Sequence, residues 1–192
     1  MNLAILILGL VLFLAVHSVR MLAPQWRERQ IASLGKNAWQ GIYSVLSLAS
    51  LATVIVGFAW YQPEAPILYI PPVWARHLAF LLMAIALISF MVGNFPSGRL
   101  KPMLKHPMLL AVIIWAFTHL LVNGDLASVL LFGSLLAWSV WNRISISRRI
   151  EAIPEKGPVI YDLAAIVSGL VIWALFLWKI HEWLIGVPLV IA

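Results

Sequence analysis

Two of the five histidines interrupt long apolar segments, and these two are the residues best suited to chemistry. His17 and His119 each stand inside an otherwise apolar run of the chain. Where such a run crosses a membrane, an ionisable residue is costly and usually marks a function or a specific partner. His106 precedes Pro107 at the start of an apolar run, while His77 and His181 lie near the ends of runs, where an interfacial position is expected.

A pair of buried imidazoles on different helices suits a shared metal ion or a haem iron, which takes neutral histidine nitrogens as axial ligands. A zinc site would require a third or fourth ligand, and the carboxylates of this chain stand in loops or at helix ends. Haem supplies four nitrogens of its own, and without cysteine its attachment would be non-covalent. Hydrogen bonding between helices is the alternative that the residues alone leave open.

The composition indicates which elements must position these histidines. Hydrophobic residues make up 63% of the 192-residue chain and charged residues 10%, with a mean hydropathy of +0.99. So few charges cannot cover the surface of a soluble enzyme. A disordered chain and a coiled coil are excluded as well, because both need far more polar residues. An integral membrane protein in a lipid bilayer is therefore predicted. In a membrane protein, basic residues in the loops set the orientation of the chain. The net charge of +6 therefore indicates topology and not a surface that binds nucleic acid.

Six apolar segments approach the length that a bilayer core requires, and none alternates as a β-barrel strand would. The sequence therefore predicts an all-α, polytopic transmembrane bundle of about six helices, forming a single domain over 1–192. The first segment is expected to be a retained helix, since it lacks the flanks of a cleaved signal peptide. The segments are Leu3–Leu22, Gly41–Tyr61, Trp74–Val92, Pro107–Val122, Leu126–Trp141 and Asp162–Leu184.

Basic residues predict the orientation of this bundle. Eleven of the thirteen gather in or beside three alternate loops, which leaves Arg76 and Lys179 for the other side. By the positive-inside rule those three loops are cytoplasmic, and both termini lie outside. The eleven residues are Arg20, Arg27, Arg29, Lys36, Arg99, Lys101, Lys105, Arg143, Arg148, Arg149 and Lys156.

The fourth and fifth segments are each about 16 residues long and are expected to form a short antiparallel hairpin. Only Asn123-Gly124-Asp125 joins them, a tight turn in which the aspartate can cap the following helix. A capped turn explains this sequence. A tip that lies below the outer membrane surface, with protein or water as partners for its polar groups, explains it equally well.

Three stretches of the chain resemble the NnrU family of bacterial membrane proteins. They are VHSVRMLAPQWR (Val16–Arg27), LGKNAWQGIYS (Leu34–Ser44) and KHPMLLAVIIWAFTHLLVNGDLASVLLFG (Lys105–Gly133). The resemblance covers nearly the whole chain. It implies a multi-pass protein of the bacterial inner membrane, associated with the expression of nitrite and nitric oxide reductases in denitrification. It also implies a relation to zeta-carotene isomerase, a membrane enzyme that uses haem b with histidine ligands.

The resemblance assigns roles to individual residues. The HS motif of the isomerase matches His17-Ser18, and its HP motif with a later histidine matches His106-Pro107 and His119. His17 and His119 are thereby implied as the axial ligands of haem b, with His106 as a reserve ligand. Another histidine of the isomerase is replaced here by Trp138, so haem could be kept while isomerase activity is lost.

Arg20 and Arg27 lie in the first of the three stretches, close to His17, and we expect them to pair with the haem propionates. Two classes of function remain open. The first is a haem-binding protein acting as a redox-gated isomerase, an electron-transfer protein with a redox partner or a haem-handling factor; an isomerase would take a small hydrophobic substrate. The second is a non-catalytic membrane assembly factor or small-molecule permease in which the histidines only bridge helices.

Overall fold

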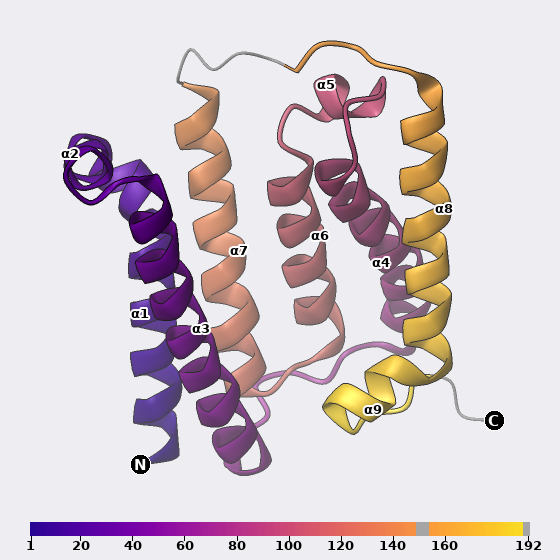
Figure 1. The fold of residues 1–192 in the computed structure, drawn as a ribbon. Coiled ribbons are helices and arrows are strands. Elements are labelled where there is room, and N and C mark those ends of the chain that lie inside the picture. The colour runs from indigo at the N-terminus through magenta and orange to yellow at the C-terminus, as the bar shows by residue number, and fades with distance from the viewer. Residues whose placement is uncertain (149–153, 190–192) are drawn as a thin grey trace. The chain divides into compact units, whose positions relative to one another are not determined.

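The structure, a computed structural model, describes residues 1–148 and 154–189 (Figure 1). Within these residues every regular element is helical, apart from one isolated β-bridge. The elements are α1 (Asn2–Leu22), α2 (Pro24–Leu34), α3 (Lys36–Tyr61), η1 (Gln62–Glu64), α4 (Val73–Asn94), α5 (Leu100–Leu104), α6 (Pro107–Val122), α7 (Leu126–Ser147), α8 (Val159–Leu175), η2 (Phe176–Ile180) and α9 (His181–Ile185).

Five helical segments of the described chain are long and apolar enough to cross a membrane, which confirms the prediction of a helical membrane protein. They are built on α1, α3, α4, α7 and the segment that begins with α8. The remaining expected segment, the fourth, is found as α6 with the predicted bounds, but its 16 residues make it shorter than the others. The number of spans and the orientation of the termini stay predictions.

Three expected boundaries were wrong. The second segment does not begin at Gly41, because α3 already begins at Lys36. The fifth segment does not end at Trp141: α7 continues through Asn142 and Arg143 to Ser147 and is 22 residues long. Polar side chains at the end of a span can reach out of the apolar layer without breaking the helix, so a change in polarity does not mark its end. The last segment begins earlier than Asp162, and its helix passes through the π-helical turn η2 before α9.

The chain divides into two compact units, which are described separately. Unit 1 holds residues 1–71 and 119–148, and unit 2 holds residues 72–118 and 154–189. The end of α6 that carries His119 therefore belongs to unit 1, and the start of α6 belongs to unit 2. The expectation of a single domain over 1–192 stays a prediction.

In unit 1, α1 and α3 run antiparallel with their backbones in close contact. Gly9 faces Val54, and Gly57 faces Leu6, so that an added Cβ would stand 2.6 Å from the nitrogen of Val54 or 2.5 Å from that of Leu6. Glycine is needed at both positions because no side chain fits there. Ala127 at the start of α7 completes the buried cluster at this contact.

The turn before α7 is capped by aspartate, which was one of the two explanations that the sequence left open; the depth of its tip in the membrane stays a prediction. Asp125, which is buried, accepts hydrogen bonds from the backbone N–H of Ser128 (2.9 Å) and from its hydroxyl (2.7 Å). Capping by aspartate satisfies N–H groups that have no partner within the helix.

The segment between η1 and α4 is bonded to this turn. We call its residues 65–72 the strap, of which residues 65–71 belong to unit 1. Its part in unit 1 is bonded to the turn through the N–H of Leu68, which donates to Gly124 (2.7 Å), and through the carbonyl of Pro66, which accepts from Leu126 (2.9 Å). The Tyr69 hydroxyl contacts the carbonyls of Leu120 and Asn123 at the end of α6. The polar groups of the turn therefore have protein partners.

In unit 2, α4 and α8 pack antiparallel. The indole N–H of Trp173 donates to the carbonyl of Phe80 (2.9 Å), and Gly169 lies against Ile88. The buried carboxylate of Asp162 accepts the backbone N–H groups of Arg99 (2.8 Å) and Leu100 (3.1 Å), which ties the loop before α5 to α8.

Candidate functional site

His17 stands on α1 five residues before the end of that helix, and its ring has a fixed orientation. The ring Nδ1 lies 2.7 Å from the carbonyl oxygen of Phe13, one helical turn earlier. Because a carbonyl only accepts, Nδ1 carries the proton, and in a neutral imidazole Nε2 then carries the lone pair. Histidines that bind a metal through one ring nitrogen typically donate the N–H of the other nitrogen to a backbone carbonyl. The hydrogen bond of His17 is of this kind.

Aromatic rings from three helices surround His17. Phe13 on α1 stacks on the imidazole at a centroid distance of 4.0 Å, while Tyr43 on α3 and Trp138 on α7 meet it edge-on at 5.7 and 6.1 Å. The indole N–H of Trp138 donates to the hydroxyl of buried Ser18 (2.9 Å), which holds the indole in place. Three aromatic rings therefore contact the imidazole, and the ring of Trp138 is itself hydrogen-bonded.

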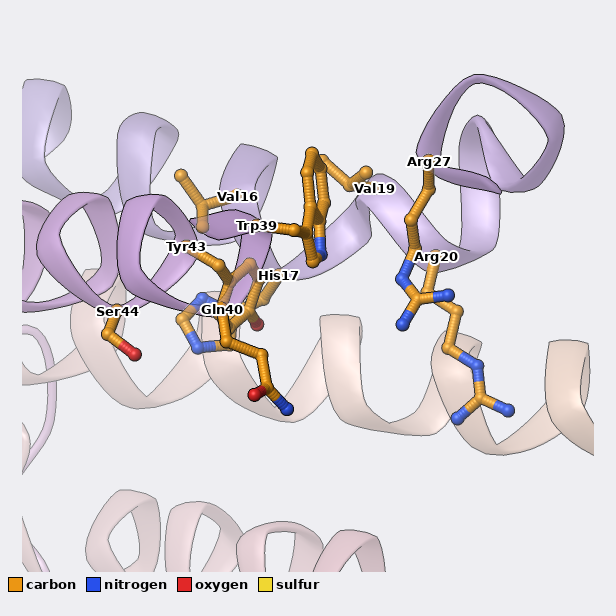
Figure 2. A pocket seen from close by; sticks show the side chains of 9 residues that line it. All are labelled: Val16, His17, Val19, Arg20, Arg27, Trp39, Gln40, Tyr43 and Ser44. Carbon is orange, nitrogen blue, oxygen red and sulfur yellow. The ribbon is translucent and has the colours of Figure 1, made fainter. Parts of the chain in front are cut away.

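A pocket of about 510 Å³ opens beside this imidazole (Figure 2). Its volume is within the range of small-molecule and cofactor sites, roughly 300–1,000 Å³. Two guanidinium groups, those of Arg20 and Arg27, line it, and no carboxylate is found among the described residues of its wall. An anionic group is therefore favoured here. The wall consists of Val16, His17, Val19, Arg20, Arg27, Trp39, Gln40, Tyr43 and Ser44.

His119 belongs to unit 1 but does not line this pocket. Its ring stacks on Phe132 of α7 at 4.6 Å, whereas His17 meets Trp138 of the same helix. Phe132 and Trp138 stand six positions apart, which is about 9 Å along a helix. The two histidines thus contact α7 at different heights, and His119 is not brought into the pocket beside His17.

The structure thus brings together three of the five predicted site residues, namely His17, Arg20 and Arg27. His106 lies before α6 and belongs to unit 2, whereas the residues of the pocket belong to unit 1. His77 is exposed on α4, and the ring of His181 donates to the carbonyl of Val187 (2.8 Å). In the parts of the chain that the structure describes, no three histidine or carboxylate residues form a metal-binding group.

Sequence reasoning missed several residues that surround His17 or line the pocket. Phe13 could have been found, because a residue four positions before a helical histidine shares its face. Trp39 and Tyr43 stand in the second stretch of the resemblance, but nothing in their spacing indicated a contact with α1. Trp138 was noted only as a departure from the isomerase, and the structure places it against His17.

The fold and the pocket define a helical membrane protein with a basic, aromatic-lined site between helices. A family model described as NnrU protein matches residues 5–189, nearly the whole chain. The chain therefore belongs to the NnrU family, as its three stretches predicted. Comparison with curated proteins and with solved structures gave no match.

Proposed function

We propose that this NnrU family protein binds haem b in the pocket beside His17. The observation that carries the proposal is the His17 imidazole beside the pocket, whose Nδ1 proton is held by the carbonyl of Phe13, so that the lone pair of Nε2 would be available to an iron. Arg20 and Arg27 fit the two propionates, because a guanidinium pairs with a carboxylate through two charge-assisted hydrogen bonds. The pocket thus contains one of the two predicted axial ligands and both predicted propionate partners, while His119 lies outside its wall.

His119 is proposed as the second axial ligand. The resemblance assigns it this role, and it shares unit 1 with His17. His106 is kept as a reserve ligand on the same resemblance. Bound haem would supply a redox-active iron; the protein residues would hold its axial position, pair its propionates and exclude water with the rings of Phe13, Tyr43 and Trp138.

The protein is proposed to lie in the bacterial inner membrane with both termini outside. The eleven basic residues of the alternate loops support this orientation, which would put the pocket near the cytoplasmic surface. A periplasmic reporter enzyme fused after Ala192 should be active, and a fluorescent protein at the same place should be dark; the opposite pattern would contradict the orientation. By family resemblance the protein would either serve nitrite and nitric oxide reductase expression in denitrification or have an isomerase-like redox activity.

An absorption spectrum of the purified protein, produced with ample haem supply, tests the proposal. The parent protein should show the Soret band of a low-spin haem, and acid acetone should extract the haem because the chain has no cysteine. His17→Ala should lose most of this band, and His119→Ala should shift it toward high spin. His77→Ala, at an exposed residue of unit 2, is the matched control and should leave the spectrum unchanged.

A parent protein without a Soret band, or an unchanged band in both variants, would overturn haem binding. The alternative function would then apply, in which the protein is an assembly factor or permease and its histidines are structural. The ring contacts of His17 with Phe13 and of His119 with Phe132 are the observations that favour this alternative, since they serve packing equally well.

A further inference from the structure

Three aliphatic side chains of the strap are largely exposed. Ile67, Leu68 and Ile70 are 68%, 54% and 87% exposed, although the backbone between them is bonded to the turn before α7. Three large aliphatic side chains in four consecutive residues are unusual for a loop in water. The strap therefore presents a cluster of apolar side chains, which we call the strap face, on a firmly attached backbone.

The backbone of the strap has few donors to offer to water. Three of its eight residues, Pro66, Pro71 and Pro72, carry no N–H. The N–H groups of Ala65, Leu68 and Tyr69 donate to carbonyls of the protein. Irregular backbone enters a membrane only where such groups have partners, since each unpaired one costs several kcal/mol. The strap meets this condition for most of its donors.

The single β-bridge limits how deep the strap can lie. The bridge joins Ile67 to Asp125, and the two bonds beside it are made by Leu68 and Pro66. In an antiparallel pair of this kind, the N–H and C=O of the bridging residue itself point away from the partner strand. Those of Ile67 must therefore reach water or lipid headgroups, which excludes the centre of the bilayer.

The strap also follows a surface that faces lipid. It comes directly after α3 and η1, and α3 is one of the spans, with exposed Trp60 at its last turn. Tryptophan is typical of the membrane–water interface. The strap face thus continues the apolar surface of α3 at the level of its aromatic end.

We propose that the strap face lies in the membrane at the boundary between headgroups and acyl chains. Its aliphatic side chains enter the acyl layer, while the backbone of Ile67 stays among the headgroups. The strap is then an interfacial anchor that holds the closed end of unit 1 at a fixed depth. This inference does not depend on haem binding.

The chain has no cysteine, so a spin label on a single introduced cysteine tests this depth directly. The full chain would be placed in liposomes of phosphatidylethanolamine and phosphatidylglycerol, with the label at Ile70→Cys. Gln62→Cys, at an exposed polar residue just before the strap, is the water control. Leu46→Cys, at an exposed leucine of α3, is the acyl-chain control.

The ratio of oxygen to nickel-chelate accessibility should be several-fold higher at Ile70→Cys than at Gln62→Cys and lower than at Leu46→Cys. A ratio equal to that of Gln62→Cys would overturn the proposal in favour of a loop in water. A ratio equal to that of Leu46→Cys would overturn the boundary depth. Shielding from both reagents would assign the strap face to a second copy or another protein. Ile67→Cys provides an independent position should Ile70→Cys fail to fold.

Discussion

The two ends of unit 1 are built in opposite ways. At one end, which we call the closed end, α1 and α3 touch through Gly9 and Gly57, and the strap pairs the polar groups of the turn before α7. At the other end, the open end, the last turns of α1 and the first turns of α3 border a pocket of about 510 Å³. Gly41 of α3 has no described atom of a neighbouring element within 4 Å of an added Cβ.

Within one pair of helices, the closed end thus contributes to stability, and the open end has room for a ligand. Backbone contact and satisfied polar groups at the closed end leave no room for a ligand. Aromatic and basic side chains at the open end leave a cavity with an oriented imidazole. His119 lies toward the closed end and His17 at the open end, so these two histidines occupy different environments on the same scaffold.

The largest effect is expected where the helices touch. Gly57→Ala places a methyl group against the backbone of Leu6, which must move α1 away from α3. Overpacking of this kind lowers the free energy of unfolding by about 1–3 kcal/mol, measurable as a lower melting temperature of the purified protein. Gly41→Ala at the open end is the matched control and should be neutral or stabilising by up to about 1 kcal/mol, since alanine favours a helix. Equal melting temperatures for the two variants would remove the contrast between the ends.

Removal of the cap at the closed end should have the next largest effect. Asp125→Ala leaves the N–H and the hydroxyl of Ser128 without their acceptor. The loss in free energy of unfolding is about 1–2 kcal/mol. Asp125→Asn keeps a capping oxygen and should retain most of the stability in the same melting experiment. If asparagine were as damaging as alanine, the charge of Asp125 and not its hydrogen bonds would hold the turn.

Tyr69→Phe should cost about 1 kcal/mol, because it removes the hydroxyl that serves the carbonyls at the end of α6. The loss should depend on pH. Burial, with a smaller contribution from the negative charge of Asp125, raises the pKa of Tyr69 above its ordinary value of 10.0.

Since the pKa of Tyr69 is higher in the folded state, its stabilising effect is fully present below pH 10 and is lost as pH rises through the raised value. Melting temperatures of the parent and of Tyr69→Phe should therefore converge above pH 10. A constant difference from pH 8 to the alkaline limit would contradict a role for the phenolic proton.

The smallest effect is expected from conservative changes at the open end. Arg20→Lys and Arg27→Lys keep the charge but lose the planar pair of donors, so haem retention should fall a few-fold. Arg148→Lys, at an exposed residue after α7, should leave haem retention unchanged. The same result is expected for Arg149→Lys, although this residue lies outside the part of the chain that the structure describes. Equal tolerance at all four positions would reduce the arginines to determinants of topology.

The sequence predicted what depends on local order and missed what depends on distant contacts. The bounds of α6 follow from Pro107 and from the turn after Val122, and the cap by Asp125 follows from its place before an apolar run. The end of α7 was misplaced because polarity, on which the boundary rested, does not interrupt helical hydrogen bonds.

The candidate site divides in the same way. His17 was found because a histidine is conspicuous in an apolar helix, and its link to Phe13 is a matter of helical spacing. Tyr43 and Trp138 could not be found, since their contacts with His17 join three helices through tertiary packing. The strap could not be found from the sequence, because its partner, the turn at Gly124, lies far along the chain.

The bond between Trp138 and Ser18 has a consequence for the order in which the protein is made. Its two residues stand 120 positions apart, and a ribosome adds roughly 5–20 residues per second. α1 and α3 are therefore complete well before Trp138 emerges, and the imidazole of His17 waits roughly 6–24 seconds for its last aromatic neighbour. During synthesis this side of the site stands open, and the arrival of α7 closes it.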